Sequence, residues 1–273
     1  MSNLNINPEL AQKILTSFIH SETTRVGYAK AIIGLSGGID SALSCFLAAE
    51  ALGPQNVLAV RMPYASSSED SLEDAQRVID ATGVQSLTIP ITDMIDPYLV
   101  NLPDDAQLRR ANLMPRMRML ILYDQSAAFN GLVVGTSNKT EILLGYSTIF
   151  GDSASAFNPI GDLYKTQVRQ LSEHLGVPKE IMDKPPSADL CVGQTDEQEL
   201  GFAYADVDNL FALLIDQRYS PEDCVAAGFD QDFVEDVIRR VRQNHYKRVL
   251  PPIAKLSNRT VGYDFLYLRD WGT

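Results

Sequence analysis

A strand, a tight loop and a helix are predicted by the stretch Ala31-Ile32-Ile33-Gly34-Leu35-Ser36-Gly37-Gly38-Ile39-Asp40-Ser41. The stretch begins as an apolar run, turns at Ser36-Gly37-Gly38 and continues from Asp40 to Leu52 with helical spacing. The two glycines leave the backbone of the loop free of side-chain bulk. Because a helix N-terminus presents unsatisfied N–H groups and partial positive charge, we expect this loop to bind a phosphate.

The loop also carries hydroxyls at Ser36 and Ser41 and a carboxylate at Asp40. A carboxylate next to a phosphate suggests an intervening metal ion, so Asp40 is predicted to be a Mg²⁺ ligand. The alternative is an ordinary strand-to-helix turn, in which the glycines permit positive φ and a polar side chain caps the helix. No Gly-Lys-Ser/Thr follows, so the loop does not fit the P-loop pattern.

Composition limits the class of protein. The chain has 273 residues, of which 45% are hydrophobic, and a formal net charge of −12. We expect one domain spanning residues 1–273, and no nucleic-acid partner, because phosphate backbones are bound by clustered cations. The cysteines, Cys45, Cys191 and Cys224, are sparse and far apart, which favours reduced thiols in the cytoplasm. The sequence shows no signal peptide and no apolar run of ~18 residues, so no membrane association is expected.

Apolar segments alternate with helical patterns along the first half of the chain. The predicted strands are residues 31–35, 56–62, 85–91 and 131–136. The predicted helices are residues 8–27, 40–52, 69–80, 93–101, 104–130, 165–175, 200–218, 223–228 and 230–244. Continuous apolar strands between helices predict an α/β fold, with a doubly wound, mainly parallel sheet covered on both faces. Pro115 is expected to kink or divide the segment 104–130.

Ligands of such sheets bind at the carboxyl ends of the strands. These ends are predicted at Ser36-Gly37, Met62-Pro63 and Thr136-Ser137. Thr136 offers a hydroxyl there, and Glu141 offers a second carboxylate that could share Mg²⁺ with Asp40. The alternative for Glu141 is an acidic side chain that complements the dipole of a helix first turn.

Lys165 lies at a predicted helix start, where a positive charge opposes the helix dipole, so we expect it to bind a phosphate group. Ser187 is a possible phosphate donor within the irregular segment 184–198, which is interpreted as an active-site lid or, alternatively, a polar surface crossing. Arg116 and Arg118 are two residues apart and point about 200° apart on a helix, so they should reach different partners. The alternative is that both arginines are exposed to solvent on the surface and bind no ligand.

Taken together, these motifs resemble those of the NAD⁺ synthetase family within the N-type ATP pyrophosphatases. The blocks that carry the resemblance follow the family's order: Ser36 to Ser41, Arg116-Met117-Arg118-Met119, Gly135 to Glu141 with Gly145-Tyr146, Lys165-Thr166-Gln167-Val168, Pro186 to Leu190, Gly193 to Glu197, and Tyr246-Lys247-Arg248. The resemblance implies a Rossmann-like fold of the adenine nucleotide alpha hydrolase type. It also implies a ligase that converts deamido-NAD⁺, ATP and ammonia to NAD⁺, AMP and pyrophosphate through an adenylated nicotinate carboxylate.

The resemblance also implies roles for individual residues. Asp40, Glu141 and Lys165 would be catalytic, and Asp40 and Glu141 would hold Mg²⁺. The implied ATP-binding residues are Gly34, Leu35, Ser36, Gly37, Gly38, Ile39, Asp40, Ser41, Met62, Arg118, Thr136, Lys165 and Ser187. The implied deamido-NAD⁺ residues are Arg116, Asp152, Glu199, Tyr246 and Lys247. Family members are homodimers, and because the pattern begins near residue 8, no amidase domain is expected and free ammonia would be the donor.

Three residues depart from the family's pattern. Ile149 stands where many members have Lys, Ala156 where some have Asp, and Cys191 where many have Trp. These departures concern recognition of deamido-NAD⁺ and leave the ATP-binding residues in place. Two other functions stay open at this point: another amidating ligase of the same superfamily, and a non-catalytic nucleotide sensor that has kept the loop.

Overall fold

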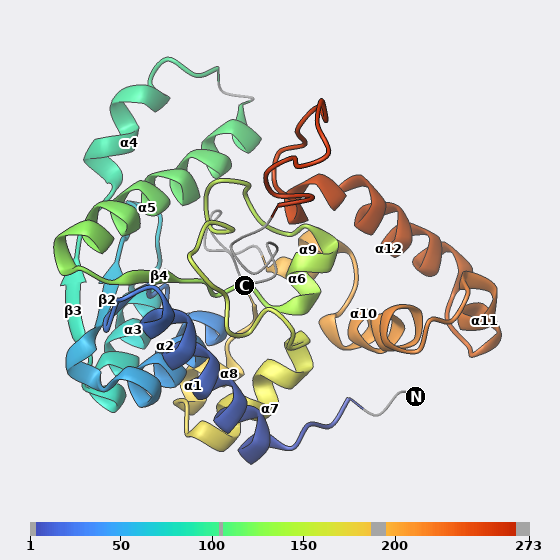
Figure 1. The fold of residues 1–273 in the computed structure, drawn as a ribbon, viewed down its shortest axis with the longest axis horizontal. Coiled ribbons are helices and arrows are strands. Elements are labelled where there is room, and N and C mark those ends of the chain that lie inside the picture. Colours follow the sequence, from blue (N-terminus) through green and yellow to red (C-terminus); the bar gives the residue numbers. More distant parts are fainter. Residues whose placement is uncertain (1–3, 104–105, 187–194, 266–273) are drawn as a thin grey trace.

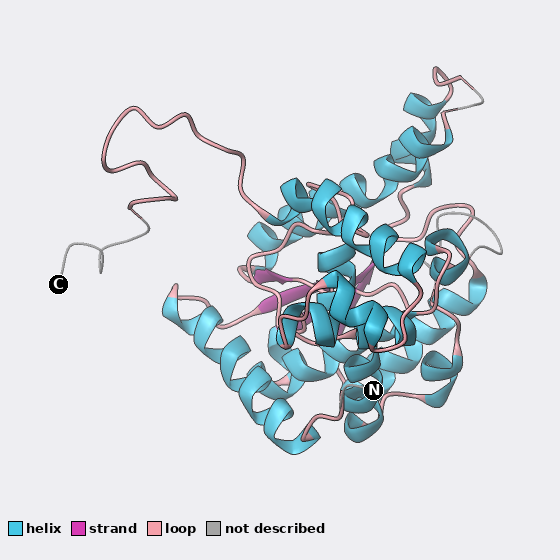
Figure 2. Cartoon of the chain, turned by 90° about the vertical axis from the view of Figure 1, so that its right-hand side faces the viewer, coloured by secondary structure: helices cyan, strands magenta, loops and turns pink. Residues whose placement is uncertain are grey.

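A parallel β-sheet forms the centre of the computed structural model, which describes residues 4–103, 106–186 and 195–265. Within these residues the sheet consists of β1 (Ala31–Gly34), β2 (Val57–Arg61), β3 (Gln85–Thr88) and β4 (Leu132–Val134). The strand order is β3-β2-β1-β4, and every pair is parallel. Helices surround the sheet (Figures 1 and 2). The predicted α/β class with a parallel sheet is confirmed.

Both faces of the two central strands are buried. Successive strand residues point to opposite faces, so Ile33 and Ala59 pack on one side and Ile32 and Val60 on the other. The first face is covered by α1 (Pro8–Arg25), α2 (Ile39–Leu52), α3 (Glu69–Thr82) and α7 (Lys165–Leu175). The second face is covered by α4 (Thr92–Leu99) and α5 (Gln107–Phe129). This arrangement is the doubly wound sheet that the apolar strands predict.

A third hydrophobic cluster lies beyond the sheet and contains residues of α6, α9, α10, α11 and α12. These helices and their neighbours are α6 (Lys139–Leu144), α8 (Lys179–Asp183), α9 (Asp196–Leu200), α10 (Tyr204–Phe211), α11 (Pro221–Ala226) and α12 (Gln231–Gln243). The short helical turns η1 (Pro54–Asn56), η2 (Ala212–Asp216) and η3 (His245–Arg248) complete the described elements. Because α7 packs against both α2 and α10, it joins this layer to the sheet.

The structure refines three of the predicted elements. The helix α5 runs through Pro115 without a division, and Pro115 is buried together with Met114. A proline inside a helix costs about 3 kcal/mol or more, from the lost hydrogen bond and the clash of its ring, and burial of this helix against the sheet outweighs that cost. The predicted helix 200–218 is divided, because Gly201 adopts φ +83° and ends α9 before α10 begins. The strand β3 is exposed along its length and lies at the edge of the sheet.

Gly37 is predicted to be more sensitive to a methyl group than a glycine of positive φ that lies in open space. An added Cβ at Gly37, where φ is +84°, would lie 2.3 Å from the Ser71 carbonyl oxygen of α3. We expect Gly37→Ala to lower the free energy of unfolding in two ways. The left-handed backbone conformation costs a residue with a side chain about 1–2 kcal/mol. The close contact of the new methyl group with Ser71 costs about 1–3 kcal/mol more. Urea unfolding followed by circular dichroism measures this loss.

Gly176→Ala is the matched control, because Gly176 has φ +75° but no heavy atom within 4 Å of an added Cβ. This variant should show the strain alone. Equal losses for the two variants would contradict the close approach of α3 to the loop.

Candidate active site

The loop between β1 and α2 has an internal set of hydrogen bonds. The Ser36 and Ser41 hydroxyls lie 3.1 Å apart, and Ser41 Oγ donates to the Gly38 carbonyl at 2.9 Å. The Gly38 backbone N–H donates to Ser36 Oγ at 3.2 Å. Gly38 is the N-cap of α2, and no side chain among the described residues caps this helix. The N-terminus of α2 therefore remains available for an anionic ligand.

Three of the predicted ATP-binding residues, Gly34, Met62 and Arg118, lie close together at the ends of β1 and β2. An added Cβ at Gly34 would lie 3.4 Å from Met62 Cε, and Arg118 Nε donates to the Met62 carbonyl at 3.1 Å. Thr136 follows β4, which pairs with β1 on its other side. The predicted strand ends of β1, β2 and β4 therefore lie at one edge of the sheet, next to each other.

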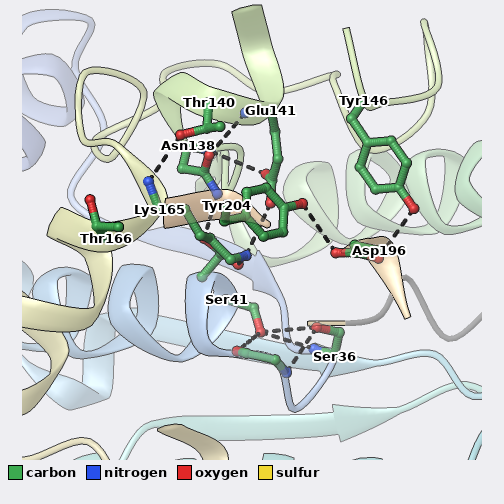
Figure 3. A network of polar contacts seen from close by, with 12 residues as sticks. Ser36, Ser41, Asn138, Thr140, Glu141, Tyr146, Lys165, Thr166, Asp196 and Tyr204 are labelled. Atoms are coloured by element: carbon green, nitrogen blue, oxygen red, sulfur yellow. Dashed lines mark hydrogen bonds and ion pairs between the residues drawn. The ribbon is translucent and has the colours of Figure 1, made fainter. Parts of the chain in front are cut away.

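Two carboxylates and an ammonium group meet beside the loop (Figure 3). Lys165 Nζ, from the first residue of α7, lies 2.5 Å from Asp40 Oδ2 of α2 and 3.1 Å from Glu141 Oε1 of α6. The side chains of Lys165, Asp40 and Glu141 are 6%, 17% and 14% exposed. Asp40 and Glu141 thus converge, as the strand-end argument predicts.

Asn138 holds both carboxylates and was not singled out as a site residue in the sequence. Its side-chain amide donates to Asp40 Oδ1 at 2.8 Å. It also forms a capping box with Glu141: Asn138 Oδ1 accepts from the Glu141 N–H at 3.0 Å, and Glu141 Oε2 accepts from the Asn138 N–H at 3.3 Å. Glu141 therefore takes part in the cap of α6, in whose first turn it lies, and also faces Asp40 and Lys165.

Burial and charge act against each other in this cluster. The pKa of Glu141 is raised to about 7, because burial, with a smaller contribution from the charge of Asp40, outweighs the lowering by the charge of Lys165. Burial by itself lowers the pKa of Lys165, but the carboxylates of Asp40 and Glu141 raise it above its ordinary value. The lysine is therefore a buried cation that is held by anionic partners.

The residues fit a divalent cation. Oxygens of Asp40 and Glu141 both reach one cationic centre, the Lys165 ammonium, within 3.1 Å. The described residues contain no group of three or more His, Cys, Asp or Glu side chains that could hold a metal by themselves. Mg²⁺ is usually bound by one or two carboxylates, with substrate phosphates and water as its other ligands.

An outer polar network of tyrosines and acids lies next to Lys165 (Figure 3). The Lys165 ammonium is 5.1 Å from the centre of the Tyr204 ring. The Tyr204 hydroxyl donates to Asp196 Oδ2 at 3.3 Å, and the Tyr146 hydroxyl lies 3.2 Å from Asp196 Oδ1 and 2.8 Å from Glu199 Oε2. Burial and the neighbouring carboxylates raise the pKa of both phenols, which therefore stay neutral donors. The sequence motifs contain Tyr146 and Asp196 but do not indicate this contact.

The residues predicted for deamido-NAD⁺ are spread over several contacts. Arg116 Nε lies 3.4 Å from the Ile149 carbonyl, whereas Arg118 contacts Met62, so the two arginines face different segments as their spacing predicts. Asp152 accepts from the Thr148 N–H at 2.7 Å.

The remaining positions singled out in the sequence differ in their contacts and exposure, or lie outside the described residues. Lys247 Nζ donates to the carbonyls of Gly145 and Ser147 at 2.7 and 2.8 Å, which ties η3 to the end of α6. Tyr246 is exposed. Ser187, the predicted phosphate donor, and Cys191 lie outside the described residues.

The fold and the site define a class of protein. A parallel α/β sheet carries a glycine-containing loop at an uncapped helix N-terminus, next to a pair of carboxylates, and this arrangement is typical of a nucleotide-dependent enzyme.

Comparison with known proteins then identifies the family. Residues 11–251 match the family model described as NAD synthase. The chain is 56% identical over 272 residues to the NH(3)-dependent NAD(+) synthetase of Trichlorobacter lovleyi, with 100% of both chains covered. The chain belongs to the NAD synthase family, and the resemblance predicted from its motifs, with the C–N ligase class that it implies, is confirmed.

Solved structures agree on the fold. The structure of NMN synthetase from Francisella tularensis aligns with a TM-score of 0.81 at 29% identity, and covers 92% of this chain and 100% of that one. An NH3-dependent NAD synthetase from Campylobacter jejuni aligns with a TM-score of 0.78 at 32% identity, with the same coverage. In the part of the chain that the structure describes, no helix has the length and apolar character required to cross a bilayer.

Replacement of Asn138 is predicted to cost more than the loss of an ordinary helix cap. Asn138 is fully buried, and Asn138→Ala removes both the cap of α6 and the amide donor to Asp40. We expect a loss of about 2–4 kcal/mol of unfolding free energy, measured by urea denaturation without nucleotide, because a cap and a buried hydrogen bond to a charged group are lost together.

Ser220→Ala is the control, since Ser220 forms the same type of capping box at α11 on the surface. That change should cost about 1 kcal/mol. A loss for Asn138→Ala no larger than for Ser220→Ala would show that the contact with Asp40 contributes nothing.

Proposed function

We propose that this chain amidates deamido-NAD⁺ to NAD⁺ with ammonia and ATP, releasing AMP and pyrophosphate. The observation that carries the proposal is the convergence of the 36–41 loop, Asp40, Glu141 and Lys165 at one edge of the sheet, in a chain 56% identical to an NH(3)-dependent NAD(+) synthetase. No protein nucleophile is required, because the substrate supplies the attacking oxygen. The protein's contribution is to position the reactants and to offset charge.

In the first step an oxygen of the nicotinate carboxylate attacks the α-phosphorus of ATP. The new P–O bond forms the acyl adenylate, and the bond to pyrophosphate breaks. The N-terminus of α2, with Ser36 and Ser41, would bind the departing pyrophosphate, and Lys165 would offset its charge. Asp40 and Glu141 would hold Mg²⁺, which supplies charge neutralisation to the phosphates when bound.

In the second step ammonia attacks the carbonyl carbon of the adenylate and the C–O bond to AMP breaks, which leaves the amide of NAD⁺. Ammonia must lose a proton in this step, and the site must exclude water, which would return the acid. Met62 and Arg118 would contact the adenine nucleotide. Arg116, Asp152, Glu199, Tyr246 and Lys247 would contact deamido-NAD⁺, and Ser187 and Thr136 would contribute to the ATP site.

The proposal includes a homodimer. Apolar side chains are exposed on α4 and α5 and in the segment after η3: Met94, Tyr98, Val100, Leu108, Leu120, Tyr123, Val249, Leu250, Ile253, Leu256, Val261 and Tyr263. The C-terminal segment also leads away from the rest of the chain (Figure 2). Exposed apolar surface of this extent is typical of a subunit interface, and cyclic dimers are the commonest assembly.

The proposal further treats residues 1–273 as one domain that uses free ammonia in the cytoplasm. The packing of α7 against both α2 and α10 supports a single domain. Cys45 and Cys224 are free and buried, which supports a reducing compartment.

The direct test measures AMP and NAD⁺ formed from Mg-ATP with deamido-NAD⁺ and ammonium, with each substrate omitted in turn and with glutamine in place of ammonium. Products that require both deamido-NAD⁺ and ammonium are expected. Nicotinate mononucleotide is the competing acceptor, because the structure with a TM-score of 0.81 is an NMN synthetase. A higher kcat/KM for that acid would change the substrate assignment. The absence of AMP with either acid would favour a nucleotide sensor or another amidating ligase.

Asp40→Asn is expected to abolish turnover while the fold stays intact, because the carboxylate that faces Lys165 and the metal loses its charge. Circular dichroism and the rate of AMP release measure the two effects. Near-wild-type turnover in this variant would remove Asp40 from the metal site.

Leu120→Glu is expected to shift the dimer toward monomer in sedimentation velocity at micromolar concentration. Leu120 is 57% exposed on α5, and a charge there would have to be desolvated in a dimer interface. Val26→Glu is the control, since Val26 is 54% exposed at the end of α1, away from the proposed interface. A wild-type chain that sediments as a monomer over the whole range would contradict the dimer.

A further inference from the structure

We propose that Asp208, on α10, is a positioning residue that holds the N-termini of α6 and α7 together and thereby sets the Lys165 ammonium between Asp40 and Glu141. The effect of this positioning on turnover rests on the proposed function. Asp208 lies outside every motif that carries the family resemblance, and it does not contact the reacting groups in the proposed chemistry.

The Asp208 carboxylate joins two helix starts. Its Oδ1 accepts from the Thr140 hydroxyl of α6 at 2.5 Å, and its Oδ2 accepts from the Thr166 backbone N–H of α7 at 2.8 Å. The Thr140 oxygen in turn accepts from the Lys165 backbone N–H at 3.0 Å (Figure 3). Asp208 and Thr140 are both fully buried. The Asp208 carboxylate therefore holds the backbone of α7 in two ways: directly at the Thr166 N–H, and through the Thr140 hydroxyl at the Lys165 N–H.

The connected residues are the immediate neighbours of the site residues. Thr140 precedes Glu141, and Thr166 follows Lys165. The first N–H groups of α7 would lack partners by themselves, because Tyr164 provides no side-chain cap, and here the partners come from other helices. If these bonds are lost, α7 can shift relative to α6, and the Lys165 ammonium moves with it.

Burial destabilises the charged carboxylate of Asp208, so a packing role alone does not explain an aspartate at this position. It forms no ion pair among the described residues, although its side chain is fully buried. Burial raises its pKa, and the hydrogen bonds from Thr140 and Thr166 lower it. A buried carboxylate must be compensated by hydrogen bonds and by nearby positive charge. Here the hydrogen bonds come from Thr140 at the start of α6 and Thr166 at the start of α7, and the positive charge comes from Lys165. The cost of burial is thus offset by contacts that connect the two helix starts.

Two variants remove the connection in different ways. Asp208→Asn places an amide donor where Thr140 needs an acceptor, and Thr140→Val removes the hydroxyl while keeping the side-chain shape. We expect each to lower kcat about 100-fold, as for a displacement of about 1 Å at a catalytic group, with KM for ATP and for deamido-NAD⁺ changed less than about threefold. Thr140→Ser keeps the hydroxyl and should restore kcat to within about threefold of wild type.

Ser172→Ala is the matched control. Ser172 is fully buried on the same helix, α7, and its hydroxyl has no hydrogen-bond partner among the described residues. It should leave kcat and KM unchanged. In a Lys165→Ala background, Asp208→Asn should cause no further loss of kcat, because its effect operates through Lys165.

A second measurement does not depend on turnover. Acylation of lysines by sulfo-NHS-acetate, followed by mass spectrometry without ligands, should label Lys165 slowly relative to the exposed Lys13, since Lys165 is buried and paired. Asp208→Asn and Thr140→Val should raise the Lys165 labelling rate at least about tenfold, and Thr140→Ser and Ser172→Ala should not.

Unchanged kcat and unchanged labelling in Thr140→Val, a variant that tests the link even if Asp208→Asn fails to fold, would overturn the proposal. An undiminished effect of Asp208→Asn in the Lys165→Ala background would also overturn it. A wild-type chain that forms no AMP, with Lys165 labelling that still responds to Thr140→Val, would reject the proposed function and support the positioning role.

Discussion

The charge balance around the Lys165 ammonium is the constraint on which the site depends. A buried lysine is costly unless anionic groups surround it closely, and here Asp40 and Glu141 lie 2.5 and 3.1 Å away. The same two carboxylates would repel one another if nothing cationic stood between them. The three groups therefore require each other, and the helices that carry them have to meet at one point.

The parallel sheet provides that meeting point. The strands β1 and β4 are neighbours, and the chain leaves both at the same edge, so α2 and α6 begin side by side. The helix α7 packs against α2 and also against α10, which brings a third helix start to the same place. Each start contributes one charged side chain within its first turn, where short distances can be held with little freedom. The sheet thereby brings three separate sequence motifs into one buried cluster of charged side chains.

Much of the architecture could be predicted from local patterns. Apolar runs that alternate with amphipathic or apolar helices specify a covered parallel sheet. Asn and Ser are preferred N-cap residues, and Asn7 and Ser68 cap α1 and α3 in the structure. The prediction failed where tertiary packing overrides a local rule. Burial keeps α5 continuous through Pro115, and the left-handed conformation of Gly201 divides a helix that the apolar pattern makes continuous.

The motif residues Asp40, Glu141 and Lys165 could be assigned to a site because each has a chemical reason to be near phosphate that is visible in its own short segment. Asn138, Tyr204 and Asp208 could not be assigned in that way, since their side chains act on residues far away in the chain. Hydrogen bonds between helix starts depend on the relative placement of α6, α7 and α10, and no local pattern encodes that placement. By itself the sequence determined the fold class, the strand–loop–helix unit at residues 31–52 and the charged residues that follow the strands, because strand periodicity and helix-end chemistry are local properties. Only the tertiary structure decided which groups hold those residues in place, because a contact across many residues of chain exists only after the layers have packed.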